Sequence, residues 1–200
     1  MKIRFLFFCF IFILSGCAQI PVDDAPKNDS WSQHQRQLQN LNNWQLSGKL
    51  AFITPEERIS LNLFWQQSDQ EFQITLTNFV GLSVLDVKKD RSETKIIFDG
   101  KTYYGDDTET LIKQLSGFVI PIDVLQQWIK GNPTDAVYQL NENNQLLSLN
   151  GQDKHNINWS IDYADYKTTQ HINLPHKLQL KRPNLRLKFA INKWIITDKA

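Results

Sequence analysis

Apolar and polar residues alternate through most of the chain after residue 43, and this period of two predicts β-strands with one buried face. In the segment 59–65, "ISLNLFW", apolar side chains occupy every second position, with Ser60 and Asn62 on the opposite side. Strands with a single apolar face are typical of an antiparallel sheet that is covered on one side only. The same alternation marks further segments: "WQLSGKLAF", "FQITLTN", "VLDVKKD", "TKIIFDG", "VYQL", "LLSLNG", "INWSIDY", "HKLQLKR" and "LRLKFAINKW".

Three other segments have apolar residues at helical spacing. Ser30 is a favourable N-cap for a helix over 31–41, and Asp107 is one for a helix over 108–115. The third segment, 121–131, begins near a proline and stops at a glycine, as helices often do. Because there is no repeat and no internal linker, the pattern predicts one mainly β domain with about ten strands and three helices.

Periodicity alone does not decide whether the sheet and the helices enclose a solid core or a cavity. Trp128 lies on a predicted helix whose apolar stripe must be buried against the sheet. A helix inside a strongly curved sheet buries both apolar faces, and large side chains then either fill the interior or prop the layers apart. Both interpretations stay open at this level.

The first 16 residues have the order of a secretory signal, with a basic start, an apolar run over 5–14 and then small residues. This run is shorter than the ~20 apolar residues of a membrane-spanning helix, although a short anchor that stays attached is the alternative. The sequence "LSGC" at 14–17 resembles a bacterial lipobox, in which Cys17 receives a diacylglycerol and becomes the first residue. We therefore expect a signal peptide over 1–16, a lipidated N-terminus and tether over 17–29, and a single domain over 30–200.

The residue after this cysteine indicates the destination of the lipidated chain. Ala18 resembles the sorting signal for the outer membrane, whereas an aspartate there would indicate retention in the inner membrane. Two or more lipid chains hold a protein firmly to a bilayer, and a single chain holds it weakly. We therefore expect a lipid-anchored protein of the outer membrane that faces the periplasm of a Gram-negative bacterium.

Composition excludes several classes of function. Loss of Lys2 and Arg4 with the signal reduces the 22 basic residues to 20, against 21 acidic ones, so no excess of positive charge attracts nucleic acid. The two cysteines are Cys9, inside the signal, and Cys17, so no free thiol remains for a disulfide or a zinc site. No metal, cofactor or nucleic-acid ligand is predicted.

Motifs of catalysis are also missing from the sequence. The histidines do not have the spacing of a metal site, and the five-residue separation of His171 and His176 places them on different faces of a helix or a strand. The segment 81–85, "GLSVL", lacks the second glycine of a nucleophile elbow, and there is no glycine-rich phosphate loop. The chain is therefore predicted not to be an enzyme.

One connection between strand-like segments, inside 76–87 ("LTNFVGLSVLDV"), is unusually apolar. Gly81 supplies the positive φ angle that a tight connection needs, yet its neighbours are large hydrophobic residues where loops normally have polar ones. The turns "TPEER" and "QSDQ" on either side are polar. The apolar loop is therefore predicted to have a function, unless its side chains fold back onto the edge of the sheet.

Several segments together resemble the LolB family of outer-membrane lipoprotein receptors. They are "GKLAF", "LFWQQ", "LTNFVG", "IPIDVLQQWIKGNPTDA" and "LRLKFAINKW", in this order behind a lipobox. The resemblance implies a single open, curved antiparallel sheet, a half-barrel, with helices over its concave face and an apolar cavity between them. It also implies a periplasmic carrier, LolA, as the partner that delivers acylated lipoproteins, and we expect the chain to act as a monomer.

The resemblance gives the apolar loop a role. In this family the loop after "LTN" protrudes into solvent, and a leucine at its tip is needed to pass lipoproteins into the inner leaflet of the outer membrane. Val80 occupies the matching position, and Phe79 replaces the proline of the usual "NPLG". The expected membrane-insertion loop is therefore Phe79, Val80, Gly81 and Leu82.

The resemblance also implies a cavity for acyl chains, because each methylene exposed to water costs about 0.8 kcal/mol. With no nucleotide site, transfer must run downhill in affinity, and a tenfold preference needs about 1.4 kcal/mol. The alternative function is a structural or assembly lipoprotein that contacts a protein partner through the apolar loop. The candidate residues of the cavity are Leu50, Phe52, Leu63, Trp65, Ile74, Leu76, Leu115 and Trp128.

Overall fold

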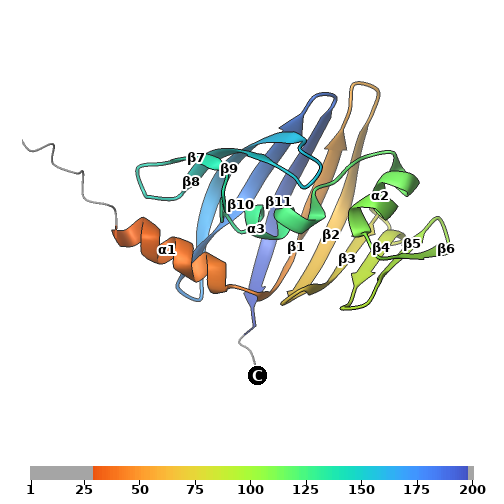
Figure 1. Ribbon diagram of the computed structural model, residues 1–200, viewed down its shortest axis with the longest axis horizontal. Coiled ribbons are helices and arrows are strands. Elements are labelled where there is room, and N and C mark those ends of the chain that lie inside the picture. Colours follow the sequence, from red (N-terminus) through yellow and green to blue (C-terminus); the bar gives the residue numbers. More distant parts are fainter. Residues whose placement is uncertain (1–28, 198–200) are drawn as a thin grey trace, which may run out of the picture.

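The structure, a computed structural model, describes residues 29–197, which form one antiparallel sheet of 11 strands and three helices (Figure 1). The helices are α1 (Asp29–Asn40), α2 (Thr108–Ser116) and α3 (Ile122–Trp128). The strands are β1 (Asn43–Ile53), β2 (Arg58–Ser68), β3 (Glu71–Thr77), β4 (Ser83–Lys89), β5 (Thr94–Phe98), β6 (Lys101–Gly105), β7 (Val137–Leu140), β8 (Leu146–Gln152), β9 (Asn158–Thr169), β10 (Ile172–Arg182) and β11 (Leu185–Ile196).

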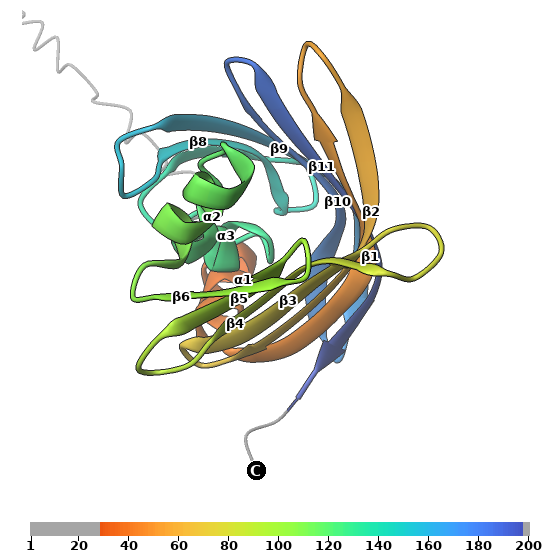
Figure 2. The same ribbon diagram turned by 90° about the vertical axis from the view of Figure 1, so that its right-hand side faces the viewer.

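The sheet is strongly curved, and α2 and α3 lie on its concave side (Figure 2). Its strand order is β6-β5-β4-β3-β2-β1-β11-β10-β9-β8-β7, so two runs of neighbouring strands meet where the first strand pairs with the last. At this seam Leu50 of β1 lies between Leu61 of β2 and Phe189 of β11. The arrangement confirms the predicted single curved antiparallel sheet with three helices.

Inward-facing aromatic side chains fill much of the concave interior. Trp65, Trp44 and Trp194 come from the adjacent strands β2, β1 and β11, and the ring of Trp44 has its centroid 5.3 Å from each of the other two. Large aromatic side chains bury about 150–250 Å² each, so this cluster makes a major hydrophobic contribution to the fold. The strand alternation seen in the sequence is therefore the alternation between this core and solvent.

The caps predicted for α2 are present. The Asp107 side chain accepts a hydrogen bond from the backbone N–H of Glu109 at 3.0 Å. At the other end Gly117 adopts a φ of 76°, and its N–H donates to the carbonyl of Lys113 at 2.8 Å. These caps fix both ends of α2, which is therefore a short helix over the concave face.

Two local predictions are wrong. The strand β6 has the sequence "KTYYG", whose lack of alternation hid it, although the preceding Asp99 and Gly100 form a turn with φ angles of 50° and 70°. That turn makes β5 and β6 a hairpin, which raises the strand number above the ten expected from alternation. Ser30 lies inside α1 rather than capping it, and its hydroxyl accepts a hydrogen bond from Asn144 at 3.1 Å.

Candidate functional site

The connection between β3 and β4 projects from the convex side of the sheet, away from the helices (Figure 2). Its apolar side chains lie in solvent: Phe79 is 93% exposed, Val80 61% and Leu82 66%. Gly81 has a φ of 87° and nothing within 4 Å of where a Cβ would stand. The alternative in which these side chains fold back onto the sheet edge is therefore wrong for this structure.

Hydrogen bonds to Asn78 fix the shape of this loop. Its side-chain Oδ1 accepts from the backbone N–H of Val80 at 3.1 Å and of Leu82 at 3.0 Å. Its backbone carbonyl accepts from Gly81 N–H at 3.0 Å and from the Asn62 side chain at 3.0 Å. These bonds within the loop, together with the one from Asn62 of β2, fix its backbone, so the apolar side chains at its tip stay outward without packing against the domain.

The eight candidate cavity residues lie on the concave side, within or against one continuous core. Six of them are buried, and the other two, Phe52 and Leu115, are half-buried against that core. The structure therefore brings the candidates together, but as closely packed neighbours under the helices. Trp128 is the member of the set that lines the cavity described next.

A cavity of about 920 Å³ opens between α3, the segment 134–137 and the ends of β8, β9 and β10. Trp128 and Trp159 supply aromatic surface to its wall, and the guanidinium of Arg182 lies 5.4 Å from the ring centroid of Trp159. The Nε1 of Trp128 and the Nε of Arg182 are buried and have no hydrogen-bond partner among residues 29–197. The wall combines the apolar surface of these rings with polar side chains such as Asn150 and Asn158, and its unpaired donors suit a ligand that carries carbonyl oxygens beside hydrocarbon.

Trp159 and Arg182 were missed as candidates from the sequence. Alternation in "INWSIDY" indicates that Trp159 faces inward, but its place opposite α3 depends on how β8 and β9 curl over the helices. That curl brings together segments far apart in the chain, and no local pattern records it.

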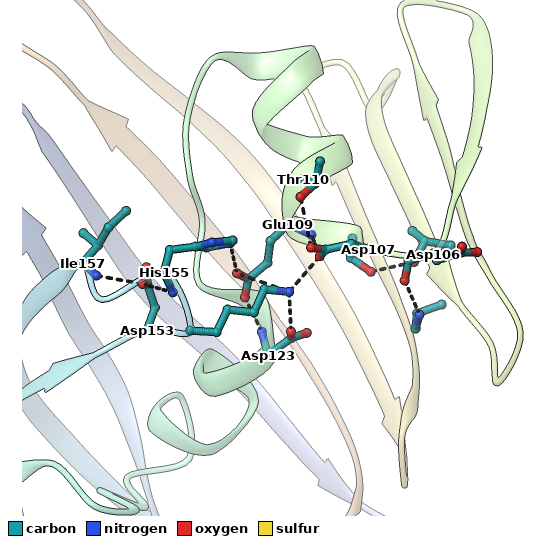
Figure 3. Close-up of polar contacts among 12 residues, drawn as sticks. Asp106, Asp107, Glu109, Thr110, Asp123, Asp153, His155 and Ile157 are labelled. Carbon is teal, nitrogen blue, oxygen red and sulfur yellow. Dashed lines mark hydrogen bonds and ion pairs between the residues drawn. The ribbon is translucent and has the colours of Figure 1, made fainter.

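A cluster of charged side chains ties both helices to the turn between β8 and β9 (Figure 3). The Lys154 ammonium lies 2.7 Å from a carboxylate oxygen of Asp107 at the start of α2 and 2.9 Å from one of Asp123 in α3. Burial alone would lower the pKa of Lys154, but its hydrogen bonds to these two carboxylates outweigh burial and raise the pKa. Burial opposes ionisation of Asp107 as well, yet the contacts with Lys154 and Thr110 lower its pKa to about 2.

Glu109 is the buried member of this cluster. Burial raises its pKa, although its carboxylate accepts a hydrogen bond from the N–H of Asp123 at 3.0 Å. The other carboxylate oxygen lies 3.2 Å from Nε2 of His155. Charged contacts therefore fasten both helices to this turn, and those of Lys154 with Asp107 and Asp123 lie near solvent, where ion pairs contribute little to stability.

Comparison with known proteins identifies the family. A family model described as outer membrane lipoprotein LolB matches residues 42–194. The chain belongs to the LolB family. An outer-membrane lipoprotein LolB from Psychromonas ingrahamii is 58% identical over 188 residues, covering 94% of this chain and 93% of the relative. The LolB proteins of Aeromonas hydrophila and Vibrio cholerae are 36% and 35% identical, with 94% and 93% of this chain covered.

Solved structures show that this fold extends beyond the LolB family. A DUF1329 family protein from Desulfovibrio piger superimposes with a TM-score of 0.59 at 5% identity, covering 86% of this chain and 92% of the other. A LolA superfamily protein from Nitrosomonas europaea gives a TM-score of 0.54 at 4% identity, covering 86% and 94%. At such low identity these likenesses show a shared fold and nothing of function.

Membership in the LolB family confirms the prediction of a non-enzymatic outer-membrane lipoprotein. The predicted lipid attachment at Cys17, the signal peptide and the tether up to residue 28 lie outside the described residues, and Asp29, the last residue assigned to the tether, begins α1. Within residues 29–197 no helix has the length and apolar content to cross a bilayer, and no group of side chains is arranged to hold a metal ion.

Proposed function

We propose that the protein accepts acylated lipoproteins from a LolA-like periplasmic carrier and inserts them into the inner leaflet of the outer membrane. The observation that carries this proposal is the apolar loop, whose tip is held in water by Asn78 in a domain of the LolB family. A soluble domain gains nothing from exposing three large hydrophobic side chains together, whereas a surface that enters a bilayer does.

The apolar loop supplies a driving force for contact with the membrane. Full burial of a Val, Leu or Phe side chain stabilises by about 1.5–3 kcal/mol relative to water. Phe79, Val80 and Leu82 are each more than half exposed, so most of this free energy is still available for transfer into lipid. Because Asn78 already fixes the backbone of the loop, little conformational entropy is lost on insertion.

The cargo chains enter the domain beneath α3 in this proposal. The cavity beside Trp128 has a volume within the range of small-molecule sites, about 300–1,000 Å³. The remaining candidates lie within or against the same continuous core, with Leu115 belonging to α2 itself. Release of the Lys154 cluster allows both helices to lift, so that acyl chains replace helix side chains as the cover of the core.

Transfer needs no fuel if each step runs downhill in affinity. A tenfold preference of the cargo for this protein over the carrier corresponds to about 1.4 kcal/mol, and the bilayer then offers a better solvent for every methylene. The cavity must bind only moderately, because a tight site retains its cargo. The lipid on Cys17 keeps the domain beside the membrane throughout.

The test begins with the mature chain carrying Cys17→Ala, mixed with a carrier that holds a fluorescent acylated lipoprotein. We expect the lipoprotein to comigrate with the protein on gel filtration and to pass into vesicles when these are added. A structural or assembly lipoprotein would instead leave the cargo on the carrier. Failure of transfer in the absence of vesicles would overturn the proposed function.

A further inference from the structure

A cluster of basic side chains, called the basic patch below, lies on the convex face of the sheet, opposite the helices. Its strands are the four central ones, β2, β1, β11 and β10. The outward direction follows from alternation, since Lys49 is exposed between the buried Gly48 and Leu50. The members of the patch are Lys49, Arg58, Lys177, Lys181, Arg186 and Lys188.

Most of this positive charge is not compensated within the domain. Lys177 pairs with Asp165 at 3.4 Å, and Lys181 pairs with Asp162. The other four members form no ion pair with any carboxylate of residues 29–197. The chain as a whole is close to neutral, with 22 basic and 21 acidic residues, so the basic patch is a local concentration of charge.

Protection of a sheet edge does not explain the basic patch. Lysines on edge strands discourage pairing with other chains. The edges of this sheet are β6 and β7, whereas the patch lies on strands that are paired on both sides. Its like charges repel one another across the sheet, which costs stability unless an anion is present.

The basic patch surrounds a hollow of about 490 Å³. Lys49, Arg58 and Lys188 line it, and the small side chains of Ala51 and Ala190 lie between them. Asp162 is the one acidic residue of its lining, and its carboxylate is paired with Lys181. Alanine at these positions leaves the space that larger outward side chains would fill. The hollow therefore has room for a phosphate-sized group within reach of several cations.

The basic patch is continuous with the base of the apolar loop. Across the sheet, Thr77 at the end of β3 pairs with Asn62 of β2, which pairs with Lys49 of β1. Two strand spacings separate Lys49 from Thr77, about 10 Å. The Asn62 side chain bridges the two features, because its amide donates to Thr77 Oγ1 at 3.3 Å and to the carbonyl of Asn78 at 3.0 Å.

We propose that the basic patch binds the headgroups of anionic phospholipids, so that the convex face lies against the membrane when the apolar loop inserts. A bilayer presents hydrocarbon directly beneath a layer of phosphates, which matches an apolar loop whose base lies about 10 Å from the nearest lysine of the basic patch. The lysine stems can lie along the interface while their ammonium groups reach the phosphates. Only the direction of loop insertion is taken from the proposed function; the charge and its placement come from the structure itself.

Vesicle binding by the mature chain with Cys17→Ala tests this inference without cargo. The variant replaces Lys49, Arg58 and Lys188 by Gln, and the probes are phosphatidylcholine vesicles with and without phosphatidylglycerol. The matched control removes the same charges elsewhere, by replacing Arg36, Lys101 and Lys113, which are exposed and form no ion pair among the described residues. Thermal unfolding shows whether both variants fold.

Each cation near an anionic surface strengthens binding about fivefold, so the patch variant should bind phosphatidylglycerol vesicles about a hundredfold more weakly at low salt. The control and the unmodified protein should bind alike, and 1 M salt should remove the difference because it reduces the Debye length to about 3 Å. Equal binding by the patch and control variants would overturn the inference. Normal vesicle binding with impaired uptake from the carrier would also overturn it, in favour of an acidic protein surface.

These outcomes are separate from those of the proposed function. A protein that takes cargo from the carrier but binds anionic and neutral vesicles equally has the receptor activity and lacks headgroup recognition. A protein that prefers anionic vesicles through the basic patch but never accepts cargo has headgroup recognition and lacks the receptor activity.

Discussion

Substitution of Val80 by Glu separates membrane delivery from folding and cargo uptake. Val80 is 61% exposed, and its backbone N–H donates a hydrogen bond to the side chain of Asn78, which the variant keeps. The unfolding transition and the transfer of lipoprotein from the carrier are therefore expected to be unchanged. In the proposed function, delivery into the bilayer is the step that requires this side chain to leave water.

The size of the defect follows from the environment of the loop tip. Without the valine side chain, the loop loses about 1.5 kcal/mol of favourable transfer free energy into lipid. An ionised carboxylate in the bilayer interior costs about 2.5–3.5 kcal/mol, and less if it stays near the interface. Together these effects raise the free energy of the inserted loop by about 3–4 kcal/mol and slow delivery by a hundredfold or more.

The assay follows a fluorescent acylated lipoprotein from the carrier, through the receptor, into vesicles that float on a density gradient. A matched control is Leu147→Glu, which places the same charge at an exposed apolar residue of β8, far along the strand order from the loop. We expect the Val80 variant to accumulate as a complex with cargo and the control to deliver normally. Delivery at the normal rate by Val80→Glu would refute the role of the loop.

Three further predictions concern the scaffold. Asn78→Ala removes the acceptor for two loop amides, so denaturant titration should show a loss of about 1–2 kcal/mol and delivery should fall with Val80 unchanged. Glu109→Gln should flatten the pH dependence of stability: the raised pKa of Glu109 gives stability that is present below pH 4.5, the ordinary value, and is lost as pH rises through the folded pKa. Chemical unfolding between pH 4 and pH 8 measures this, and an unchanged slope would contradict it. Gly48→Ala places a Cβ 2.2 Å from the carbonyl oxygen of Ala190 at the seam of β1 and β11. The free energy of unfolding should therefore fall by about 3 kcal/mol or more. A variant as stable as the parent would show that the seam can relax.

Alternation predicted those parts of the fold that depend on neighbouring residues. It located β2 and β11, whose inward and outward side chains differ strongly in polarity, and the capping residues located α2. It missed β6 because an edge strand with both faces partly in solvent has no reason to alternate. The apolar loop was found for the opposite reason, since its hydrophobic residues contradict the chemistry of an ordinary turn.

Features that depend on pairing between distant segments could not be predicted from the sequence. The segment "KLQLKR" indicates an exposed basic face on β10, but the approach of Lys49 and Lys188 depends on the pairing of the first strand with the last. The cavity beside Trp159 depends in the same way on the curl of β8 and β9 over α3. Loop-closure entropy, rather than local preference, governs such contacts, and no short window of sequence records them.

The pairing of β1 with β11 also determines when the sheet can be completed during folding. If the chain emerges with its N-terminus first, β1 becomes available early, whereas its neighbour β11 is the last of the 11 strands to emerge. Until then β1 and β10 both offer open edges to chaperones and proteases, and Trp44 has no Trp194 to pack against. A chain cut short before residue 185 lacks β11 and therefore cannot join the two halves of the sheet.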